Sequence, residues 1–277
     1  MTLDEKYNRL LSEIKELGKV VVAYSGGVDS NFLLAVCVEA IGAKNVLACI
    51  SANPSLPKGQ YDNAISMAKA MGVEIDTIYP AEMEDEKFTA NNADRCYHCK
   101  SHLFKTISQI AKQKGYQHIL CGNNFDDLDD YRPGTRAGKT LGVLSPLADA
   151  QLSKDEIRVL SKKLNLTTAE IPASPCLASR VSYKSKITAE KLQQIETGEE
   201  FLKSLGLKVF RLRHHDKVAR IEVSPQDITK LIAEPTRMKI VEKIKSLGFD
   251  FVTIDLQGFR SGAMNEALSE QEKQKNI

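Results

Sequence analysis

Four short, nearly continuous apolar runs, separated by segments of helical periodicity, constrain the fold of this 277-residue chain most strongly. Runs that are apolar at almost every position are typical of parallel strands covered by helices on both faces. The alternation of strands and helices therefore predicts an α/β fold with a doubly wound, mostly parallel sheet. The predicted strands are residues 20–24, 46–50, 75–79 and 118–121, and the predicted helices between them are residues 32–40, 60–71 and 102–114.

The second half of the chain has a different pattern, which begins after a proline-rich stretch around residues 170–185. A helix is expected to follow, with Thr188 as its N-cap and Gly206 as its C-cap. Next come a strand hairpin, two shorter helices and a last strand. We therefore expect an α/β domain over residues 1–172, a smaller α+β domain over residues 173–265 and a mobile tail over residues 266–277.

The segment KVFRLRHHDKVARIEV alternates between apolar and charged residues, which indicates a β-hairpin. A turn at residues 216–217 places Arg213 opposite Arg220 and Arg211 opposite Glu222. Because alternate residues share one face of a strand, these four charged side chains are expected on one face of the sheet.

Composition limits the classes of function. The chain has 42% apolar residues and a formal net charge of +2, so no global charge favours a nucleic acid or an anionic membrane as a partner. No apolar window is long enough for a transmembrane helix, and the charged N-terminal segment lacks the apolar core of a signal peptide. We expect a cytoplasmic protein.

The sequence SGGVDS, residues 25–30, lies between the first predicted strand and the first predicted helix. A phosphate at the start of a helix meets unpaired backbone N–H groups and the positive end of the helix dipole. Gly26 and Gly27 allow a close backbone approach, and Ser25 and Ser30 add hydroxyl donors. Neither a P-loop lysine nor a dinucleotide fingerprint is present. The segment therefore predicts a phosphate site of another kind, although such a glycine turn can also be purely structural.

A second loop, GNNFDDLDDYRPGTRAG, follows the strand at residues 118–121 and is rich in aspartate. Ligands of open α/β sheets bind at the carboxyl ends of the strands. Asp126 and Asp127 are closest to the strand end and are the preferred candidates for a metal or substrate contact. The alternative is a solvated acidic turn.

The six cysteines fall into two groups. Cys37, Cys49 and Cys121 lie in apolar segments and are expected to be buried. The other three are Cys96 and Cys99, in the C-x-x-C of RCYHCK, and Cys176, in a polar loop. This set allows an iron–sulfur cluster with one open iron, a zinc or redox pair, or unrelated thiols. Tyr97, between the first two of these, could stack on a ring or shape the loop.

The string S-G-G-x-D-S resembles the signature of the PP-loop ATP pyrophosphatases, which cleave ATP between its α- and β-phosphates. The segments NNFDDLDDYRPGTRAG, PASPCLASRVSYKSKIT, RLRHHDKVARIEV and FVTIDLQGFRSGAMN resemble those of the LarE family of ATP-dependent sulfur insertases. The match runs from about residue 10 to 265. It implies adenylylation of the carboxylates of pyridinium-3,5-biscarboxylic acid mononucleotide and their conversion to thiocarboxylates for the nickel-pincer nucleotide of lactate racemase.

The resemblance also implies roles for individual residues. The pyrophosphate loop matches at Ser25, Gly26, Gly27, Asp29 and Ser30, with Asp29 helping to bind Mg²⁺ and with Asp126 expected near ATP. Cys176 matches the cysteine that handles sulfur. Residues expected near the phosphate of the substrate are Ser179, Arg180, Arg211, Arg213 and Glu222.

Family members differ in the source of sulfur. One type sacrifices a cysteine, here Cys176, and is left with dehydroalanine. The other adds a C-x-x-C, here Cys96 and Cys99, so that three thiolates hold a [4Fe-4S] cluster; this chain resembles the second type. The family further implies a homohexamer and enzymes of the same pathway as partners. The competing hypotheses are a tRNA thiolase, which should carry a basic RNA-binding face, and a non-enzymatic nucleotide-binding scaffold with a zinc C-x-x-C.

Overall fold

The computed structural model describes residues 1–128, 133–171 and 175–274, and it divides into two compact units. Residues 1–82 and 96–171 form the first unit, and residues 83–95 and 175–274 form the second. The short segment 83–95 thus belongs with the C-terminal unit, although no sequence pattern indicated this. The expected boundary between residues 172 and 173 lies outside the described residues.

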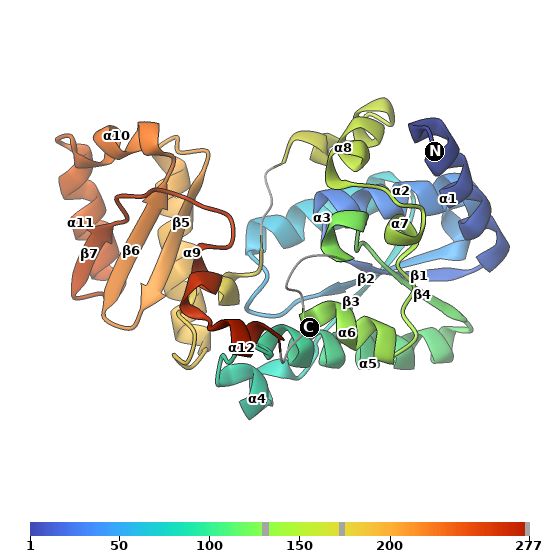
Figure 1. The fold of residues 1–277 in the computed structure, drawn as a ribbon, viewed down its shortest axis with the longest axis horizontal. Helices are drawn as coiled ribbons and strands as arrows, with labels where there is room; N and C mark the ends of the chain where they lie inside the picture. Colours follow the sequence, from blue (N-terminus) through green and yellow to red (C-terminus); the bar gives the residue numbers. More distant parts are fainter. Residues whose placement is uncertain (129–132, 172–174, 275–277) are drawn as a thin grey trace. The chain divides into compact units, whose positions relative to one another are not determined.

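The first unit contains a four-stranded parallel sheet in the order β3-β2-β1-β4 (Figure 1). The predicted mostly parallel α/β sheet is confirmed, and all four predicted strands are present within one residue of their expected limits. Their bounds are Val20–Tyr24 for β1, Val46–Ser51 for β2, Glu74–Ile78 for β3 and His118–Cys121 for β4.

Helices cover both faces of this sheet, as Figure 1 shows for α2 and α5. The helices of the first unit are α1 (Leu3–Leu17), α2 (Val28–Ile41), α3 (Lys58–Ala70), α5 (Arg95–Lys114, whose first residue belongs to the second unit), α6 (Pro133–Thr140), α7 (Pro146–Asp149) and α8 (Lys154–Lys163). Short 3-10 turns lie at Ala43–Asn45 (η1), Glu82–Glu84 (η2), Phe125–Leu128 (η3) and Thr167–Glu170 (η4), and η2 continues into the second unit.

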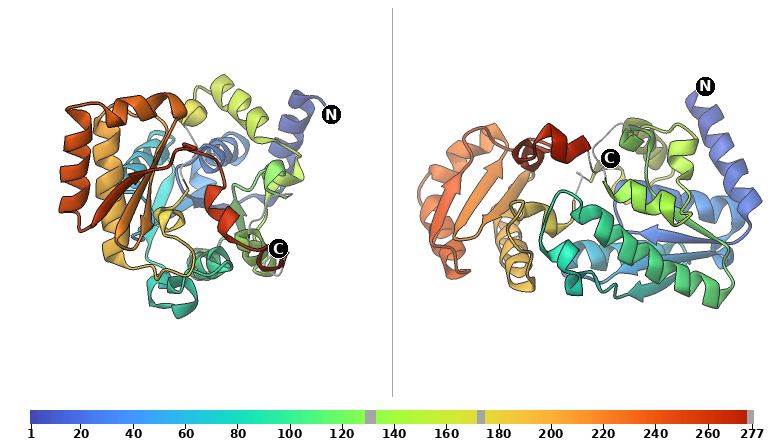
Figure 2. Two further views of the ribbon diagram at one scale, coloured as in Figure 1. Left: turned by 60° about the vertical axis from the view of Figure 1, so that its left-hand side comes forward. Right: turned by 60° about the horizontal axis from the view of Figure 1, so that its bottom comes forward.

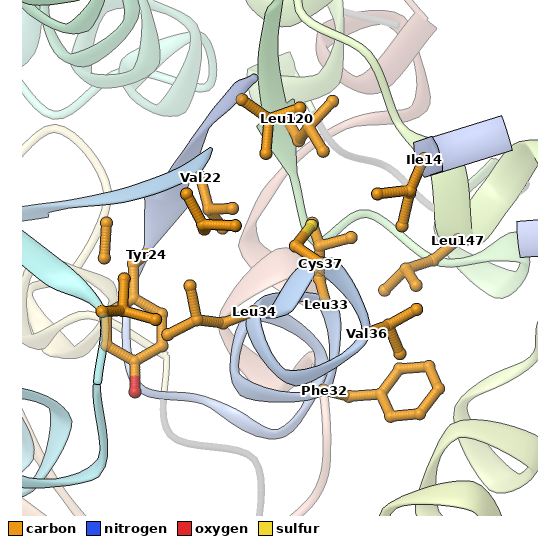
Figure 3. Packing of buried hydrophobic residues seen from close by; sticks show 14 of the residues in the cluster. Ile14, Val22, Tyr24, Phe32, Leu33, Leu34, Val36, Cys37, Leu120 and Leu147 are labelled. Atoms are coloured by element: carbon orange, nitrogen blue, oxygen red, sulfur yellow. The ribbon is translucent and has the colours of Figure 1, made fainter. Parts of the chain in front are cut away.

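The side chains of β1 alternate between two cores. Val20, Val22 and Tyr24 pack with α1, α2, α3 and α8, whereas Val21 and Ala23 pack with α5 and α6. Figure 3 shows the first of these cores: Leu33, Leu34 and Cys37 of α2 lie toward Val22 of β1, and Phe32 points to another side of the helix. Burial on both faces explains the continuous apolar runs. The three cysteines expected in apolar segments, Cys37, Cys49 and Cys121, are buried, as predicted.

The helix α5 begins earlier than the sequence predicted. Between the strand predicted at residues 75–79 and the helix predicted at residues 102–114, the structure contains a short helix α4 (Glu86–Thr89) and the first two turns of α5. The sequence did not indicate these helices because the segment is mostly polar and few of its side chains hold it in place. Phe88 is 1% exposed, and Asp85 caps α4 by accepting a hydrogen bond from the backbone N–H of Lys87. The C-x-x-C therefore lies on a helix.

The second unit is built on a three-stranded sheet in the order β5-β6-β7, with β5 (Phe210–His215) antiparallel to β6 (Val218–Val223) and β7 (Phe251–Ile254) parallel to β6. The predicted hairpin register is confirmed: Arg213 pairs with Arg220, and Arg211 pairs with Glu222. The register could be predicted from the sequence because side chains alternate between the two faces of a strand, so a shift by one residue would move every side chain to the other face.

Helices α9 (Ala189–Ser204) and α11 (Thr236–Ser246) pack on this second sheet (Figure 2). Thr188 caps α9, as predicted, and Leu205 takes the C-cap position, followed by Gly206 with φ +79°. The remaining elements of the unit are η5 (Leu177–Arg180), η6 (Pro225–Asp227), α10 (Ile228–Ile232), η7 (Ala263–Ala267) and α12 (Glu270–Gln274).

The C-terminal segment, expected to be a mobile tail from residue 266 on, carries α12 and a buried Leu268. Lys184 forms an ion pair with Glu272 of this segment, with 3.2 Å between the amine and a carboxylate oxygen.

In the described part of the chain, none of the helices has the length and apolar character needed to cross a bilayer.

Gly198 tests the packing between α9 and the second sheet. A Cβ atom at this position would lie 2.2 Å from Cδ2 of Leu212 and 3.3 Å from Cδ1 of Ile244. Because both side chains are fully buried, Gly198→Ala should destabilise the second unit by about 1–3 kcal/mol, even though alanine favours helices. Urea unfolding measures the change. Because Leu212→Ala removes the clashing side chain, the double variant should lose less stability than the sum of the two single variants, and a stabilised Gly198→Ala variant would contradict this packing.

Candidate functional site

The phosphate loop lies at the carboxyl end of β1, where the direction of strand order reverses: β2 lies on one side of β1 and β4 on the other. Such a switch point leaves a crevice for ligands in open α/β sheets. Gly26 has φ +70°, and a Cβ atom there would lie 2.5 Å from Cβ of Ala64 on α3. Both its backbone conformation and its close contact therefore require glycine.

The two serines of the loop contact each other. The Ser25 and Ser30 hydroxyl oxygens are 3.1 Å apart, and the backbone N–H of Ser25 donates to Ser30 Oγ at 3.3 Å. The N-cap of α2 is Gly27, and no side chain caps the helix. The start of α2 consequently presents its backbone N–H groups and the positive end of its dipole, as an anion site requires.

Asp29, in the first turn of α2, forms an ion pair with Lys154 at the start of α8. The backbone N–H of Lys154 also donates to Asp126 Oδ2 at 2.8 Å, so one residue connects the phosphate loop with the acidic loop. Asp29 Oδ1 is buried and has no hydrogen-bond donor within the described residues. An orphaned carboxylate oxygen of this kind fits a hard cation such as Mg²⁺.

The acidic loop packs directly against the phosphate loop. A Cβ atom on Gly122, the residue after β4, would lie 2.9 Å from the backbone nitrogen of Ser30. Asp127 is buried and accepts a hydrogen bond from the backbone N–H of Asn124, whereas Asp126 is exposed. The structure thus brings Asp126 into the group formed by Asp29 and Lys154, and it gives Asp127 a structural role within the loop.

Cys96 and Cys99 lie on the first turn of α5, three residues apart, and both are partly exposed and not disulfide-bonded. Between them, Tyr97 has the Arg136 guanidinium over its ring, 4.6 Å from the ring centroid. One face of this ring is therefore covered by a cation. Over the described ranges, no three His, Cys, Asp or Glu side chains are grouped as a metal site.

Cys176 belongs to the second unit, where it is exposed and forms the N-cap of η5. Arg180, only 1% exposed, donates to the carbonyl oxygens of Pro175 and Cys176 and forms an ion pair with Glu199 at 3.0 Å. It thus holds the turn that carries Cys176. The expectation that Arg180 also contacts a substrate stays a prediction.

Two further arginines bind the same turn. Arg95 donates to the carbonyl oxygen of Ala178 at 3.0 Å, and Arg213 donates to that of Ser179 at 3.3 Å. With Arg180, three guanidinium groups hold the backbone of residues 175–179. The thiol of Cys176 is therefore presented by a turn whose carbonyl groups are fixed.

A cluster of charges lines the β5–β6 hairpin. The fully buried Glu222 forms ion pairs with Arg213 at 2.7 Å and with Arg220 at 3.2 Å. Arg220 pairs in addition with Asp255 at 2.8 Å. The Nε atoms of both arginines are nevertheless buried without an acceptor in the part of the chain that the structure describes. Such donors fit an anionic group.

Arg211 extends this cluster. Its guanidinium lies over the Phe259 ring at 5.0 Å from the centroid, and burial, reinforced by the charge of Arg180, lowers its pKa to about 10. Burial also lowers the pKa of His215, whose Nε2 has no partner among the described residues. Taken together, Arg180, Arg211, Arg213 and Arg220 face the carboxylates of Glu199, Glu222 and Asp255, which leaves one positive charge in excess.

The sequence did not identify several residues that contact the phosphate loop or the turn that carries Cys176. Lys154 contacts Asp29 from 125 positions away, Gln60 donates to the carbonyl oxygen of Ser25 at 2.8 Å, and Arg95 holds the turn after Cys176. Arg220 was placed on the correct face but given no role. The hairpin register could have identified Arg220, whereas no local pattern could have paired Lys154 with Asp29.

Comparison with known proteins connects these sites to a family. The family model of NAD synthase matches residues 7–175. The chain is 33% identical to the pyridinium-3,5-bisthiocarboxylic acid mononucleotide synthase of Lactiplantibacillus plantarum, over 97% of this chain and 96% of the other. Uncharacterised proteins from Synechocystis sp. and Methanocaldococcus jannaschii are 38% and 32% identical, over 96% and 94% of this chain and 99% and 100% of theirs.

The matched residues 7–175 contain the whole parallel sheet and the loop SGGVDS, and the identity to the synthase continues through the second unit. Both the predicted superfamily and the predicted family are thereby confirmed. The chain belongs to the LarE family, which includes the synthase of L. plantarum, and is an ATP-using enzyme of the PP-loop superfamily.

Proposed function

We propose that this protein is an ATP-dependent sulfurtransferase that adenylylates the carboxylates of pyridinium-3,5-biscarboxylic acid mononucleotide and converts them to thiocarboxylates. The observation that carries the proposal is the 33% identity, along almost the whole chain, to a synthase of the bisthiocarboxylic acid mononucleotide. The uncapped start of α2 behind SGGVDS supports the first half-reaction, and the exposed, arginine-held Cys176 supports the second.

In the first half-reaction, a carboxylate oxygen of the substrate attacks the α-phosphorus of ATP. The bond from that phosphorus to the bridging oxygen breaks, and pyrophosphate leaves. The backbone N–H groups after Gly27 and the hydroxyls of Ser25 and Ser30 would bind the departing pyrophosphate. Asp29, with its orphaned Oδ1, and Asp126 would hold Mg²⁺, which neutralises phosphate charge when bound.

Lys154 supplies the cation that the loop itself lacks. Its amine is paired with Asp29 and its side chain is about one-third exposed, so Lys154 would also be available to a phosphate at the loop. A lysine beside Asp29 offsets the repulsion between this carboxylate and the phosphates of ATP. We therefore assign Lys154 to nucleotide binding.

In the second half-reaction, a sulfur nucleophile attacks the acyl carbon and AMP leaves. A [4Fe-4S] cluster held by Cys96, Cys99 and Cys176 would supply hydrosulfide as this nucleophile. The donor chemistry fits, since all three thiols lack a disulfide and are at least partly exposed. Arg95, which donates to the carbonyl oxygen of Ala178 in the second unit, directly precedes Cys96 in the sequence.

The alternative source of sulfur is Cys176 itself. Its thiolate would displace AMP to form a thioester; loss of the Cα proton and cleavage of the Cβ–S bond would then release the thiocarboxylate and leave dehydroalanine. A tRNA thiolase is the second alternative in function. The identity to the mononucleotide synthase over the whole chain, and a net charge of only +2, favour the small-molecule substrate.

The phosphate of the mononucleotide would bind at the hairpin cluster. Among the described residues, the buried Nε donors of Arg213 and Arg220 have no acceptor, and the cluster carries excess positive charge. Arg211, Ser179 and Glu222 would complete this site, with Glu222 orienting the two arginines rather than binding the anion. A homohexamer, partner enzymes of the same pathway and a cytoplasmic location complete the proposal by resemblance to the family.

The function and the sulfur source are tested together. Purified protein with ATP, Mg²⁺ and the dicarboxylate mononucleotide should release AMP and pyrophosphate and form thiocarboxylate. With a reconstituted cluster, Cys96→Ala and Cys99→Ala should lose repeated turnover but keep pyrophosphate release. Mass spectrometry follows the Cys176 peptide, which would lose the mass of H₂S if the cysteine were sacrificed.

Cys37→Ala, in the core of the first unit, serves as the matched thiol control and should keep full turnover. Salt-sensitive tRNA binding at micromolar strength, without pyrophosphate release from the mononucleotide, would overturn the proposed substrate.

Removal of the charge at position 154 tests the nucleotide site. Lys154→Met should raise the KM for ATP roughly 10- to 100-fold, since hydrogen bonds to charged groups contribute about 1.5–3 kcal/mol. Lys154→Arg should retain part of the affinity. Steady-state pyrophosphate release provides the measurement. Lys162→Met, on the same helix and in an exposed ion pair with Glu170, is the control, and equal KM values for the two methionine variants would refute the assignment.

The hairpin cluster predicts a selective effect on the second substrate. Arg220→Gln should raise the KM for the mononucleotide about tenfold and leave the KM for ATP unchanged, because Arg220 belongs to the cluster and not to the phosphate loop. Arg237→Gln, whose guanidinium forms an exposed pair with Glu234, removes the same charge from the same unit and should change neither constant. An equal rise in both constants would argue for a folding defect.

A further inference from the structure

The two residues that flank the SGGVDS loop are joined by a buried hydrogen bond. Tyr24 immediately precedes the loop, and Asn31 immediately follows it. The hydroxyl of Tyr24 donates to Asn31 Oδ1 at 2.8 Å. The entry and the exit of the phosphate loop are therefore held together at its base by one side-chain contact.

The amide of Asn31 continues this connection to a third element. Asn31 Nδ2 donates to Thr168 Oγ1 at 3.1 Å, and Thr168 lies in η4, 137 residues further along the chain. The exposed fractions of Tyr24, Asn31 and Thr168 are 3%, 1% and 0%. We call these three residues the loop clasp. Because the three side chains are almost fully buried, the hydroxyls of Tyr24 and Thr168 depend on the side-chain amide of Asn31 for their hydrogen bonds.

Good packing at these three positions does not require polar residues. Phenylalanine, leucine and valine would fill similar volumes, and buried polar groups are costly whenever their hydrogen bonds are imperfect. Buried hydrogen bonds instead fix one geometry, because any shift leaves a donor or an acceptor unpaired. Burial raises the pKa of Tyr24 well above its usual value, which keeps the hydroxyl protonated as a donor.

We propose that Asn31 is a positioning residue for the pyrophosphate loop, acting through Tyr24 and Thr168. The inference rests on the proposed adenylylation. Asn31 contacts the loop through its backbone, whose N–H donates to the carbonyl oxygen of Gly27 at 2.9 Å in the first turn of α2. The clasp fixes this turn relative to the end of β1, and thereby fixes the donors that meet the phosphate.

The contact between the loop serines depends on the same geometry. Ser25 follows Tyr24 and Ser30 precedes Asn31, and their hydroxyls are 3.1 Å apart. If the clasp opens, the end of β1 and the start of α2 are free to separate, so the two hydroxyls and the N–H groups of α2 no longer converge. Preorganised donors bind a developing anion better than mobile ones, since no reorganisation is needed on binding.

Stability and ligand affinity distinguish positioning from simple packing. Tyr24→Phe alone leaves Asn31 Oδ1 without a donor, so it should lower both. The triple variant Tyr24→Phe, Asn31→Leu, Thr168→Val removes every polar group of the clasp and should recover most of the stability. If the clasp positions the loop, the triple variant nevertheless binds pyrophosphate and ATP with Mg²⁺ about tenfold more weakly than the original chain.

Isothermal titration with inorganic pyrophosphate and with ATP measures affinity, and urea unfolding measures stability. Thr168→Ser keeps the hydroxyl and should bind both ligands with normal affinity, whereas Thr168→Val should lower the affinity for both. If the triple variant fails to fold, this pair of variants tests the positioning role of the clasp. Tyr61→Phe is the matched control, because the Tyr61 hydroxyl pairs with Thr77 Oγ1 at 2.8 Å in the same unit, in a hydrogen bond that involves no residue of the clasp.

Unchanged affinities in the triple variant and in Thr168→Val would overturn the inference and leave the proposed function intact. Failure of the original chain to bind either ligand would overturn the proposed adenylylation, and the inference with it.

Discussion

The close approach of backbone segments around the start of α2 is the constraint on which the first unit depends. Gly26 leaves no space for a side chain next to Ala64 on α3, and Gly122 leaves none next to the backbone of Ser30. Both contacts bring strand ends and helix starts to one point at the carboxyl edge of the sheet. Because unpaired N–H groups and carboxylates meet there, the position suits a nucleotide phosphate with its cation.

In the first unit, glycines allow the close backbone approach that shapes the candidate site. In the second unit, arginine side chains fix the backbone of the turn that carries Cys176. Three guanidinium groups hold the carbonyl oxygens of the turn that carries Cys176, and Arg180 and Arg213 are themselves fixed by Glu199 and Glu222. Buried ion pairs of this kind cost desolvation and are a weak source of stability. Their contribution is better understood as geometry: they present an exposed thiol and leave a small excess of positive charge.

Much of the fold could be predicted because its periodicities are local. Continuous apolar strands indicated a sheet buried on both faces, and alternation in the hairpin gave the pairing of Arg213 with Arg220. The first two turns of α5 were missed because their sequence is polar and the residues that hold them lie elsewhere in the chain. The candidate site could be predicted only in part: the sequence singled out SGGVDS and Cys176 as candidates, but it gave no signal for the contacts of Lys154, Arg95 and the clasp.

By itself, the sequence determined the class of sheet, the phosphate loop and the family, since each depends on residues close together in the chain. Only the tertiary structure decided which distant groups complete the loop. Lys154 reaches Asp29, and Thr168 reaches Asn31, through contacts between elements more than 100 residues apart. The physical reason is that burial and hydrogen bonding act between neighbours in space, and long crossovers in a parallel sheet separate those neighbours along the chain.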